Sequence, residues 1–234
     1  MSISQAEPEN IAVSKPELPC LPLPDFDVGD LDAVRTALAG ATPCALGQAW
    51  LPMLEPRFAP GQVRVGWRGG ALLVFAELTD RDIFTRATAL NQRMWELGDT
   101  FEMFLRPDGQ TAYFEFHVTP NNQRLQLRIP SAEAMRLARA ANVFDEFLLP
   151  GNAFHSTTWL QPENNQWFAL AVIPAIAVCG QARINPGSRW HFSFSRYDDT
   201  RGQAEPVISS TSPHAQADFH RQQEWGVLNF AASL

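Results

Sequence analysis

Hydrophobic and polar residues alternate in two neighbouring segments, 100–105 and 113–118, which is the pattern of half-buried β-strands. The sequence PDG at 107–109, between them, is a turn signal. The two segments therefore predict a β-hairpin with one apolar face and one face that carries charged and polar side chains.

Two carboxylates belong to the polar face of this predicted hairpin. If the hairpin closes symmetrically about its turn, Glu102 lies opposite Glu115, and Thr100 lies near His117. Like charges directly across a strand pair repel each other, so such a pair needs a cation, an arginine, a shared proton or a polar ligand beside it. The alternative is that both carboxylates are ordinary solvated residues on the outer face of a sheet.

Further segments with strand or helix patterns cover most of the chain. Strands are predicted at 49–54, 63–67, 71–78, 124–129, around Trp159, and at 167–173, 190–196 and 225–230. Helices are predicted from the N-cap Asp30 to Gly40, and over 131–149 from the N-cap Ser131. Residues 197–224 are polar and predict one long loop or several short ones. Many short strands with one or two short helices predict a mainly β protein, an antiparallel β-sandwich of immunoglobulin-like or jelly-roll type, and disfavour a parallel α/β fold.

The N-terminal segment differs in composition from the rest of the chain. Residues 1–24 are polar and then rich in proline, and they predict an arm lying on a single domain formed by residues 25–234. No basic region followed by an apolar core marks a secretory signal. We expect a cytoplasmic protein, or a periplasmic or secreted one if a signal has been removed.

Composition argues against several classes of partner. The chain has 234 residues and a net charge of -7, with only 18 lysines and arginines, which argues against nucleic-acid binding. No apolar run is long enough for a transmembrane helix, so we expect no membrane partner. The 3 cysteines are far apart and lack CxxC spacing, which predicts neither a disulfide framework nor a zinc site.

Five motifs follow one another in an order that resembles carbohydrate-binding module family 9 within the DOMON-like sandwiches. The first two are Trp95-x-x-Gly98-Asp99-x-x-Glu102 and Tyr113-Phe-Glu115-Phe-x-Val-x-Pro120-Asn121. The others are WFALAVIP at 167–174, PGxxW with FxFxR at 186–196, and FH with WGxL at 219–228. The resemblance spans about residues 45–230 and implies a β-sandwich that binds sugars without catalysis.

The resemblance also implies roles for individual residues. Members of the family stack aromatic rings on the apolar face of a pyranose and hold its hydroxyls with polar groups. Trp95 matches the family's aromatic residue, Glu102 matches its strand carboxylate, and Arg124 or Arg128 lies where the family has a basic partner. Arg196 would neutralise the two glutamates from a neighbouring strand. The predicted ligand-binding residues are Trp95, Asp99, Glu102, Glu115, His117, Arg124 and Arg196.

Some features of the predicted site stay open at this point. The second aromatic of a sugar sandwich has three candidates, Trp50, Trp159 and Trp225, and Asp99 is also a plausible turn cap. The expected partners are a mono- or oligosaccharide and a glycoside hydrolase. No cofactor is required, although the resemblance leaves calcium open, with only the loop pair Asp198-Asp199 to suggest it.

Two other functions compete with sugar binding. Some DOMON-like relatives hold b-type haem, for which Met94, Met103, His117 and His155 are candidate ligands, although Met103 is predicted to face the core. A glycoside hydrolase-associated domain with weak hydrolytic activity would instead use Glu102 and Glu115 as its two carboxylates.

Overall fold

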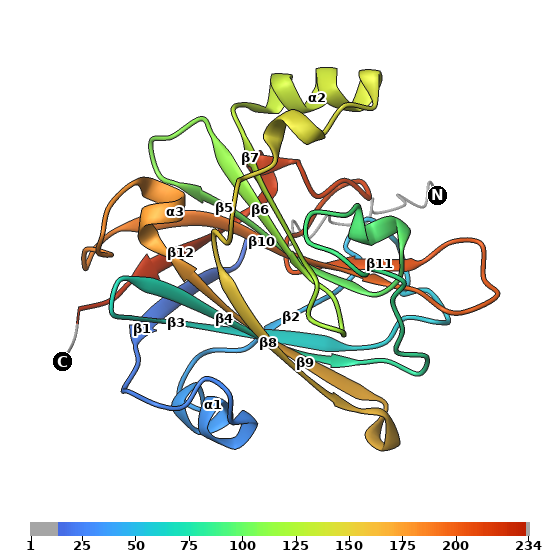
Figure 1. Ribbon diagram of the computed structural model, residues 1–234, viewed down its shortest axis with the longest axis horizontal. Helices are drawn as coiled ribbons and strands as arrows, with labels where there is room; N and C mark the ends of the chain where they lie inside the picture. Colours follow the sequence, from blue (N-terminus) through green and yellow to red (C-terminus); the bar gives the residue numbers. More distant parts are fainter. Residues whose placement is uncertain (1–13, 233–234) are drawn as a thin grey trace, which may run out of the picture.

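A computed structural model describes residues 14–232 of the chain (Figure 1). Residues 1–13, which include the predicted signal-free start and half of the predicted arm, lie outside the described residues, as do residues 233–234. Within residues 14–232, no helix is both long enough and apolar enough to cross a membrane.

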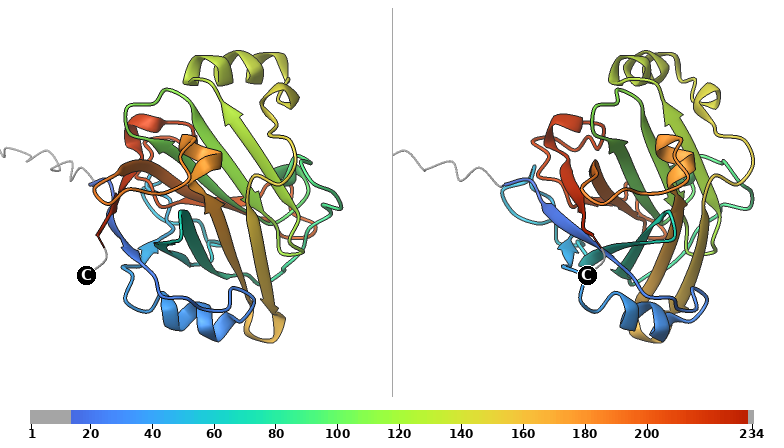
Figure 2. Two further views of the ribbon diagram at one scale, coloured as in Figure 1. Left: turned by 60° about the vertical axis from the view of Figure 1, so that its left-hand side comes forward. Right: turned by 90° about the vertical axis from the view of Figure 1, so that its left-hand side faces the viewer.

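Twelve strands form one hydrogen-bonded sheet within the described residues. They are β1 (Glu17–Pro22), β2 (Cys44–Ala45), β3 (Gly61–Arg68), β4 (Ala71–Thr79), β5 (Thr100–Pro107), β6 (Tyr113–Val118), β7 (Arg124–Ile129), β8 (His155–Gln161), β9 (Gln166–Pro174), β10 (Arg189–Asp198), β11 (Val207–Ser210) and β12 (Gly226–Phe230). The order along the sheet is β7-β6-β5-β10-β12-β1-β3-β4-β9-β8, with β11 beside β10 and β2 beside β3. The sheet wraps nearly into a barrel (Figure 2), which confirms a mainly β protein. The finer assignment as a sandwich stays a prediction.

Strand β1 joins the two halves of the sheet and corrects the prediction for the proline-rich arm. Its first four residues pair in parallel with β12, and Leu21 and Pro22 pair in parallel with β3. Each part of β1 therefore has a strand partner on one side only, which is the situation in which a sheet tolerates proline. Leu18 and Cys20 fill the core from this strand.

The helices confirm both predicted caps and add one element. Asp30 accepts hydrogen bonds from Asp32 and Ala33 at the start of α1 (Leu31–Ala37), and Ser131 caps α2 (Ala132–Ala141). Helix α2 is shorter than predicted because Asn142 takes a left-handed conformation (φ 54°) that ends it. The short helix α3 (Ala175–Cys179) was not predicted. Residues 14–232 also contain four 3-10 turns: Met94–Glu96, Asp145–Phe147, Pro162–Asn164 and Gln222–Glu224.

Most predicted strands are confirmed, except one, and one predicted loop contains a strand. Residues 49–54 form turns and bends rather than a strand, and Met53 and Leu54 are exposed there. Proline at position 52 supplies the reason, because it cannot donate a ladder hydrogen bond. The polar stretch 197–224 contains β11 in addition to loops.

Three apolar clusters divide the molecule into layers. The largest lies inside the wrapped sheet, between β3, β4 and β9 on one side and β5, β6 and β10 on the other. Helix α1 covers the outer face of β4 and β9, where Val34 and Leu38 meet Phe75 and Phe168. A third cluster lies on the outer face of β5–β7, below α2 at the top of Figure 1. The candidate site opens in this third layer.

Candidate functional site

The hairpin β5–β6 places its carboxylates in a register that differs from the prediction. Glu102 pairs with His117, and Glu115 pairs with Phe104, so the two carboxylates are diagonal neighbours rather than direct partners. The connection is centred one residue later than in the predicted pairing of Glu102 with Glu115, which moves the partner of each residue by two positions. A shift of two keeps every side chain on its predicted face, and this is why Glu102, Glu115 and His117 still lie together.

These residues form the floor of a pocket on the outer face of the sheet. The pocket has an empty volume of about 570 Å³, part of it open to solvent. Its walls come from helix α2, the 3-10 turn Met94–Glu96, and loops that flank the sheet. The lining residues are Trp95, Glu102, Phe104, Glu115, His117, Leu127, Met135, Arg139, Phe144, Tyr197, Ala217, Asp218, Phe219 and His220. The mixture of aromatic and polar walls is typical of small-ligand sites.

Two carboxylates and two imidazoles form what we call the pocket cluster: Glu102, His117, Glu115 and His220. His117 Nδ1 lies 3.3 Å from Glu102 Oε1, and His117 Nε2 lies 3.5 Å from Glu115 Oε2. His220 Nδ1 lies 3.2 Å from Glu115 Oε1. Among the described residues, the two ring nitrogens of His117 and the atom Glu115 Oε1 are buried without a partner in hydrogen-bonding geometry. Buried polar atoms are costly when unpaired, so this floor is suited to a ligand that brings hydroxyl groups.

Tyr113 explains why one oxygen of Glu115 lacks a partner. Its hydroxyl lies 2.6 Å from His220 Nδ1, and burial raises the pKa of Tyr113, so the hydroxyl keeps its proton. In the His220 tautomer that carries its proton on Nε2, this hydroxyl donates to Nδ1. His220 Nδ1 then acts as an acceptor and has no proton for Glu115 Oε1. That oxygen remains free to accept a hydrogen bond from a ligand.

Burial also shifts the protonation of the pocket cluster. It raises the pKa of Glu102 to about 7, although the neighbouring His117 lowers it. Burial by itself lowers the pKa of His117, but Glu102 and Glu115 outweigh that effect and raise it. The pKa of His220 is lowered, chiefly by burial. The raised pKa favours the positively charged form of His117, which neutralises one of the two carboxylates on either side of it.

Aromatic rings surround the pocket, but not the pairs that the sequence suggested. The Trp95 ring is half-buried, with its centroid 5.6 Å from that of His117 and 6.0 Å from that of Phe144. Phe219 lines the pocket as well. The three candidate partners of Trp95 are not among the lining residues: Trp50, Trp159 and Trp225. Trp225 lies beneath the pocket, buried against Phe104 and Tyr113.

Three of the seven predicted ligand-binding residues lie outside the pocket, on the inner face of the sheet or at its edge. Arg124 pairs with Val118 and binds the carbonyl of Phe154. Arg196 pairs with Phe101, and a residue beside Phe101 lies on the face opposite Glu102. The expectation that Arg196 neutralises Glu102 and Glu115 is therefore wrong. Trp95, Glu102, Glu115 and His117 are the four predicted residues that the fold brings together.

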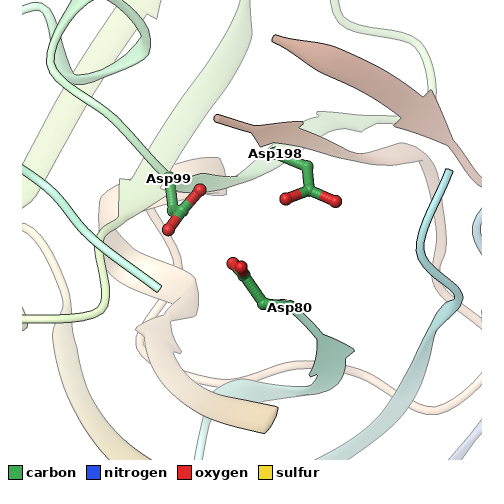
Figure 3. Close-up of side chains that lie close together, drawn as sticks. All are labelled: Asp80, Asp99 and Asp198. Carbon is green, nitrogen blue, oxygen red and sulfur yellow. The ribbon is translucent and has the colours of Figure 1, made fainter. Parts of the chain in front are cut away.

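Arg196 and Asp99 belong to a second buried group, which we call the Arg196 cluster: Asp80, Asp99, Asp198 and Arg196. The three aspartates converge from the end of β4, the residue before β5 and the end of β10 (Figure 3), with carboxylate oxygens within 4.8 Å of one another. Arg196 Nη2 lies 2.9 Å from Asp80 Oδ2 and 3.2 Å from Asp198 Oδ1. The two oxygens of Asp99 accept the backbone N–H groups of Phe84 and Asp199.

The Arg196 cluster bears on the expectation of calcium. Three carboxylates within reach of one another are a common cation site, and Asp198 is one of the two residues that the sequence suggested. The guanidinium already contacts two of the carboxylates, and backbone amides occupy the third. The cluster as it stands fits a guanidinium rather than a calcium ion.

Ten of the fourteen residues that line the pocket were not among the predicted ligand-binding residues. Arg139, Phe144, Asp218 and His220 line it from α2 and from loops, and no periodic pattern places such segments over a sheet face. One signal was present, because the FH sequence at 219–220 is part of the motifs that resemble family 9.

The competing functions find no support in this geometry. Met103 faces the inner core as predicted, His155 is exposed on β8, and neither lines the pocket with His117. Glu102 and Glu115 contact the same imidazole, which ties them together rather than placing them on either side of a glycosidic bond.

Comparison with known proteins gives a structural likeness without a sequence match. No protein-family model matches the chain, and no curated protein matches it. A solved structure of a protein from Bacteroides uniformis ATCC 8492, to which carbohydrate binding is attributed, covers 93% of this chain and 100% of its own, with 18% identity and a TM-score of 0.70.

Two solved structures of a carbohydrate-binding module of family 9 from Caldicellulosiruptor kristjanssonii share the fold as well. The complex with cellotriose covers 94% of this chain and 95% of its own, with 13% identity and a TM-score of 0.62. The complex with glucose covers 94% and 97%, with 16% identity and a TM-score of 0.59. At these identities the likeness establishes the fold, and the chain has the fold of family 9 carbohydrate-binding modules.

Proposed function

We propose that this protein binds a mono- or oligosaccharide in the pocket over β5 and β6, without catalysing a reaction on it. The observation that carries the proposal is the set of unpartnered buried atoms on the pocket floor, Glu115 Oε1 and the ring nitrogens of His117, below the half-buried ring of Trp95. Sugars combine adjacent hydroxyls with an apolar C–H face, and this floor and wall offer partners for both. The shared fold with sugar-bound modules supports the same ligand class.

In this proposal Trp95 provides the aromatic platform and Glu102 accepts hydrogen bonds from the hydroxyls. A carboxylate that accepts hydroxyl donors in a buried site forms hydrogen bonds stronger than neutral ones. Phe144 or Phe219 supplies the opposing apolar wall, in place of the three tryptophans that the sequence suggested. Membership of the DOMON-like sandwiches and a glycoside hydrolase partner remain parts of the proposal that rest on the sequence resemblance.

Calorimetric titration of the protein with glucose, cellotriose, xylotriose and maltotriose tests the proposal. We expect a saturable heat with at least one of them, and at least a tenfold loss of affinity in Trp95→Ala, because stacking contributes about 1 kcal/mol beyond buried area. Trp159→Ala is the matched control: Trp159 is also half-buried, but it lies on β8 and outside the pocket. Equal affinities of the two variants would contradict the platform, and no binding by the wild type would contradict the function.

A further inference from the structure

The pocket cluster is a continuous row of titratable groups on the floor of the proposed sugar site. Glu102, His117, Glu115, His220 and Tyr113 follow one another at contact distances of 3.3, 3.5, 3.2 and 2.6 Å. Glu102, Glu115 and His117 are at most 3% exposed. A change of protonation on any one of them therefore acts on its neighbours with little screening from water.

We propose that sugar binding in this pocket releases a proton from the row Glu102–His117–Glu115, so that the protein binds its ligand more weakly as the pH falls below neutrality. The inference rests on the proposed function and adds to it the protonation state that the ligand selects. The release of a proton follows from the charge balance of the row and from the hydrogen bonds that a sugar requires.

The charge balance of the row comes from two buried carboxylates and one imidazolium. Protonated His117 neutralises one carboxylate, and the second remains in excess in a site from which water is largely excluded. Such an excess buried charge favours uptake of a proton by one carboxylate, and burial raises the pKa of Glu102 to about 7.

The other charged groups that face the row do not remove this excess. Arg139 from α2 and Asp218 from the loop after β11 line the pocket. They form an ion pair with each other, with Arg139 Nη1 3.2 Å from Asp218 Oδ1, and both side chains are half-exposed. Burial raises the pKa of Tyr197, which lies on β10, so this residue stays neutral, as does Tyr113. His220 has a lowered pKa and also stays neutral.

A bound sugar favours the ionised form of Glu102 over the protonated form. A neutral carboxylic acid accepts hydroxyl hydrogen bonds weakly, whereas a carboxylate accepts two or more strongly, and hydrogen bonds to the charged form lower the pKa. The complex therefore needs Glu102 in its ionised form. When Glu102 is protonated beforehand, binding must expel that proton, and the apparent affinity falls with the fraction that is ionised.

The test is calorimetry with cellotriose, and with the other three sugars in parallel, at pH 6 and pH 8. With a pKa of about 7, Glu102 is mostly protonated at pH 6 and mostly ionised at pH 8, so we expect affinity about tenfold lower at pH 6. Titrations at pH 6 in two buffers of different ionisation enthalpy should show release of close to one proton for each sugar bound. At pH 8 the heat should be the same in both buffers.

Two variants test whether the released proton comes from Glu102. Glu102→Gln should bind more weakly than the wild type at both pH values, with the dependence on pH and on buffer lost. Glu133→Gln is the matched control, because Glu133 is an exposed acid on α2 that pairs with Arg136 outside the pocket. It should keep the tenfold change.

The outcomes separate this inference from the function beneath it. Binding with equal affinity at pH 6 and pH 8, and equal heats in both buffers, would overturn the inference and leave sugar binding standing. A pH dependence that survives in Glu102→Gln would also overturn it. Absence of binding at both pH values would overturn the proposed function, and the inference with it.

Discussion

The pocket cluster and the Arg196 cluster place similar chemistry on opposite faces of the same strands. Both bring buried carboxylates together, and β5 and β10 border both of them. In the Arg196 cluster, a guanidinium and backbone amides contact the carboxylates. In the pocket cluster, both ring nitrogens of His117 and one oxygen of Glu115 have no partner in hydrogen-bonding geometry. Although Arg196 Nε also lacks a partner, the carboxylates of its cluster are contacted from within the fold. A buried carboxylate that the fold itself satisfies stabilises structure, whereas one that the fold leaves unsatisfied at a cavity is available to a ligand.

The Arg196 cluster loses its counter-charge when the guanidinium is removed. We expect Arg196→Met to lower the free energy of unfolding by about 3–5 kcal/mol, because it leaves buried carboxylates without a counter-charge. The loss should be smaller at pH 5 than at pH 8, since burial raises the pKa of Asp198 to about 7 and that of Asp99 to about 9. Urea unfolding at the two pH values measures both effects.

Arg139→Met is the control for that experiment. Arg139 makes an ion pair with Asp218 at the mouth of the pocket, where both side chains are half-exposed, and such pairs contribute about 1 kcal/mol or less. If the two arginine variants were equally stable, the Arg196 cluster would not be the structural element that its contacts indicate.

The second prediction concerns the stability of the unmodified protein as a function of pH. Glu102, Asp198 and Asp99 all have pKa values raised by burial, to about 7, 7 and 9. A carboxyl whose pKa is higher in the folded state binds its proton more tightly there, so its contribution to stability is lost as pH rises through the folded value. The free energy of unfolding should therefore fall from about pH 4 to pH 9. The decline from Glu102 and Asp198 should be largely complete near pH 7, and that from Asp99 should continue to about pH 9.

Urea unfolding at intervals of half a pH unit measures this decline. Glu102→Gln should remove part of it below about pH 7 and leave the part that comes from the Arg196 cluster. A stability that rises steadily from pH 6 to pH 9 would show that these carboxyls are ionised in the folded protein, and would contradict the protonation assigned to both clusters.

The two clusters also show how far sequence could lead. Local patterns predicted β5 and β6, the caps Asp30 and Ser131, and the faces to which Glu102 and Glu115 belong, because a period of two residues fixes the face of a side chain. Register depends on the conformation of the connecting turn, and the assumed symmetric closure gave Glu102 the wrong partner. Arg196 was assigned to the wrong cluster because its face follows from its pairing with Phe101, which lies 95 positions away in the chain.

The loop 211–221 shows why part of the pocket could not be predicted from the sequence. His220 and Asp218 lie in a polar stretch with no periodicity, and the proximity of His220 to Tyr113 is a product of the tertiary fold. In the proline-rich segment, composition suggested less regular structure than the fold contains. Composition argued against a central strand there, but β1 lies between β12 and β3 because it needs a strand partner on only one side at a time.

Removal of the Tyr113 hydroxyl, which lies beside the pocket, should have a smaller effect that is confined to the pocket cluster. In Tyr113→Phe, His220 loses its hydrogen-bond donor, and its proton is free to move to Nδ1, which lies 3.2 Å from Glu115 Oε1. Glu115 then gains an internal partner, as the aspartates of the Arg196 cluster already have. We expect sugar affinity to fall about fivefold, equivalent to one hydrogen bond of about 1 kcal/mol, with the stability of the protein little changed.

Nitrogen NMR of the histidine rings, together with calorimetric titration, measures the tautomer and the affinity in one variant. Tyr197→Phe is the matched control, because Tyr197 also lines the pocket while its hydroxyl makes no hydrogen bond to His220. It should leave the His220 tautomer as it is in the wild type. If Tyr113→Phe moved the proton to Nδ1 without weakening the sugar, the free oxygen of Glu115 would not be a ligand acceptor. The distinction between a satisfied and an unsatisfied buried cluster would then rest on Glu102 and His117 alone.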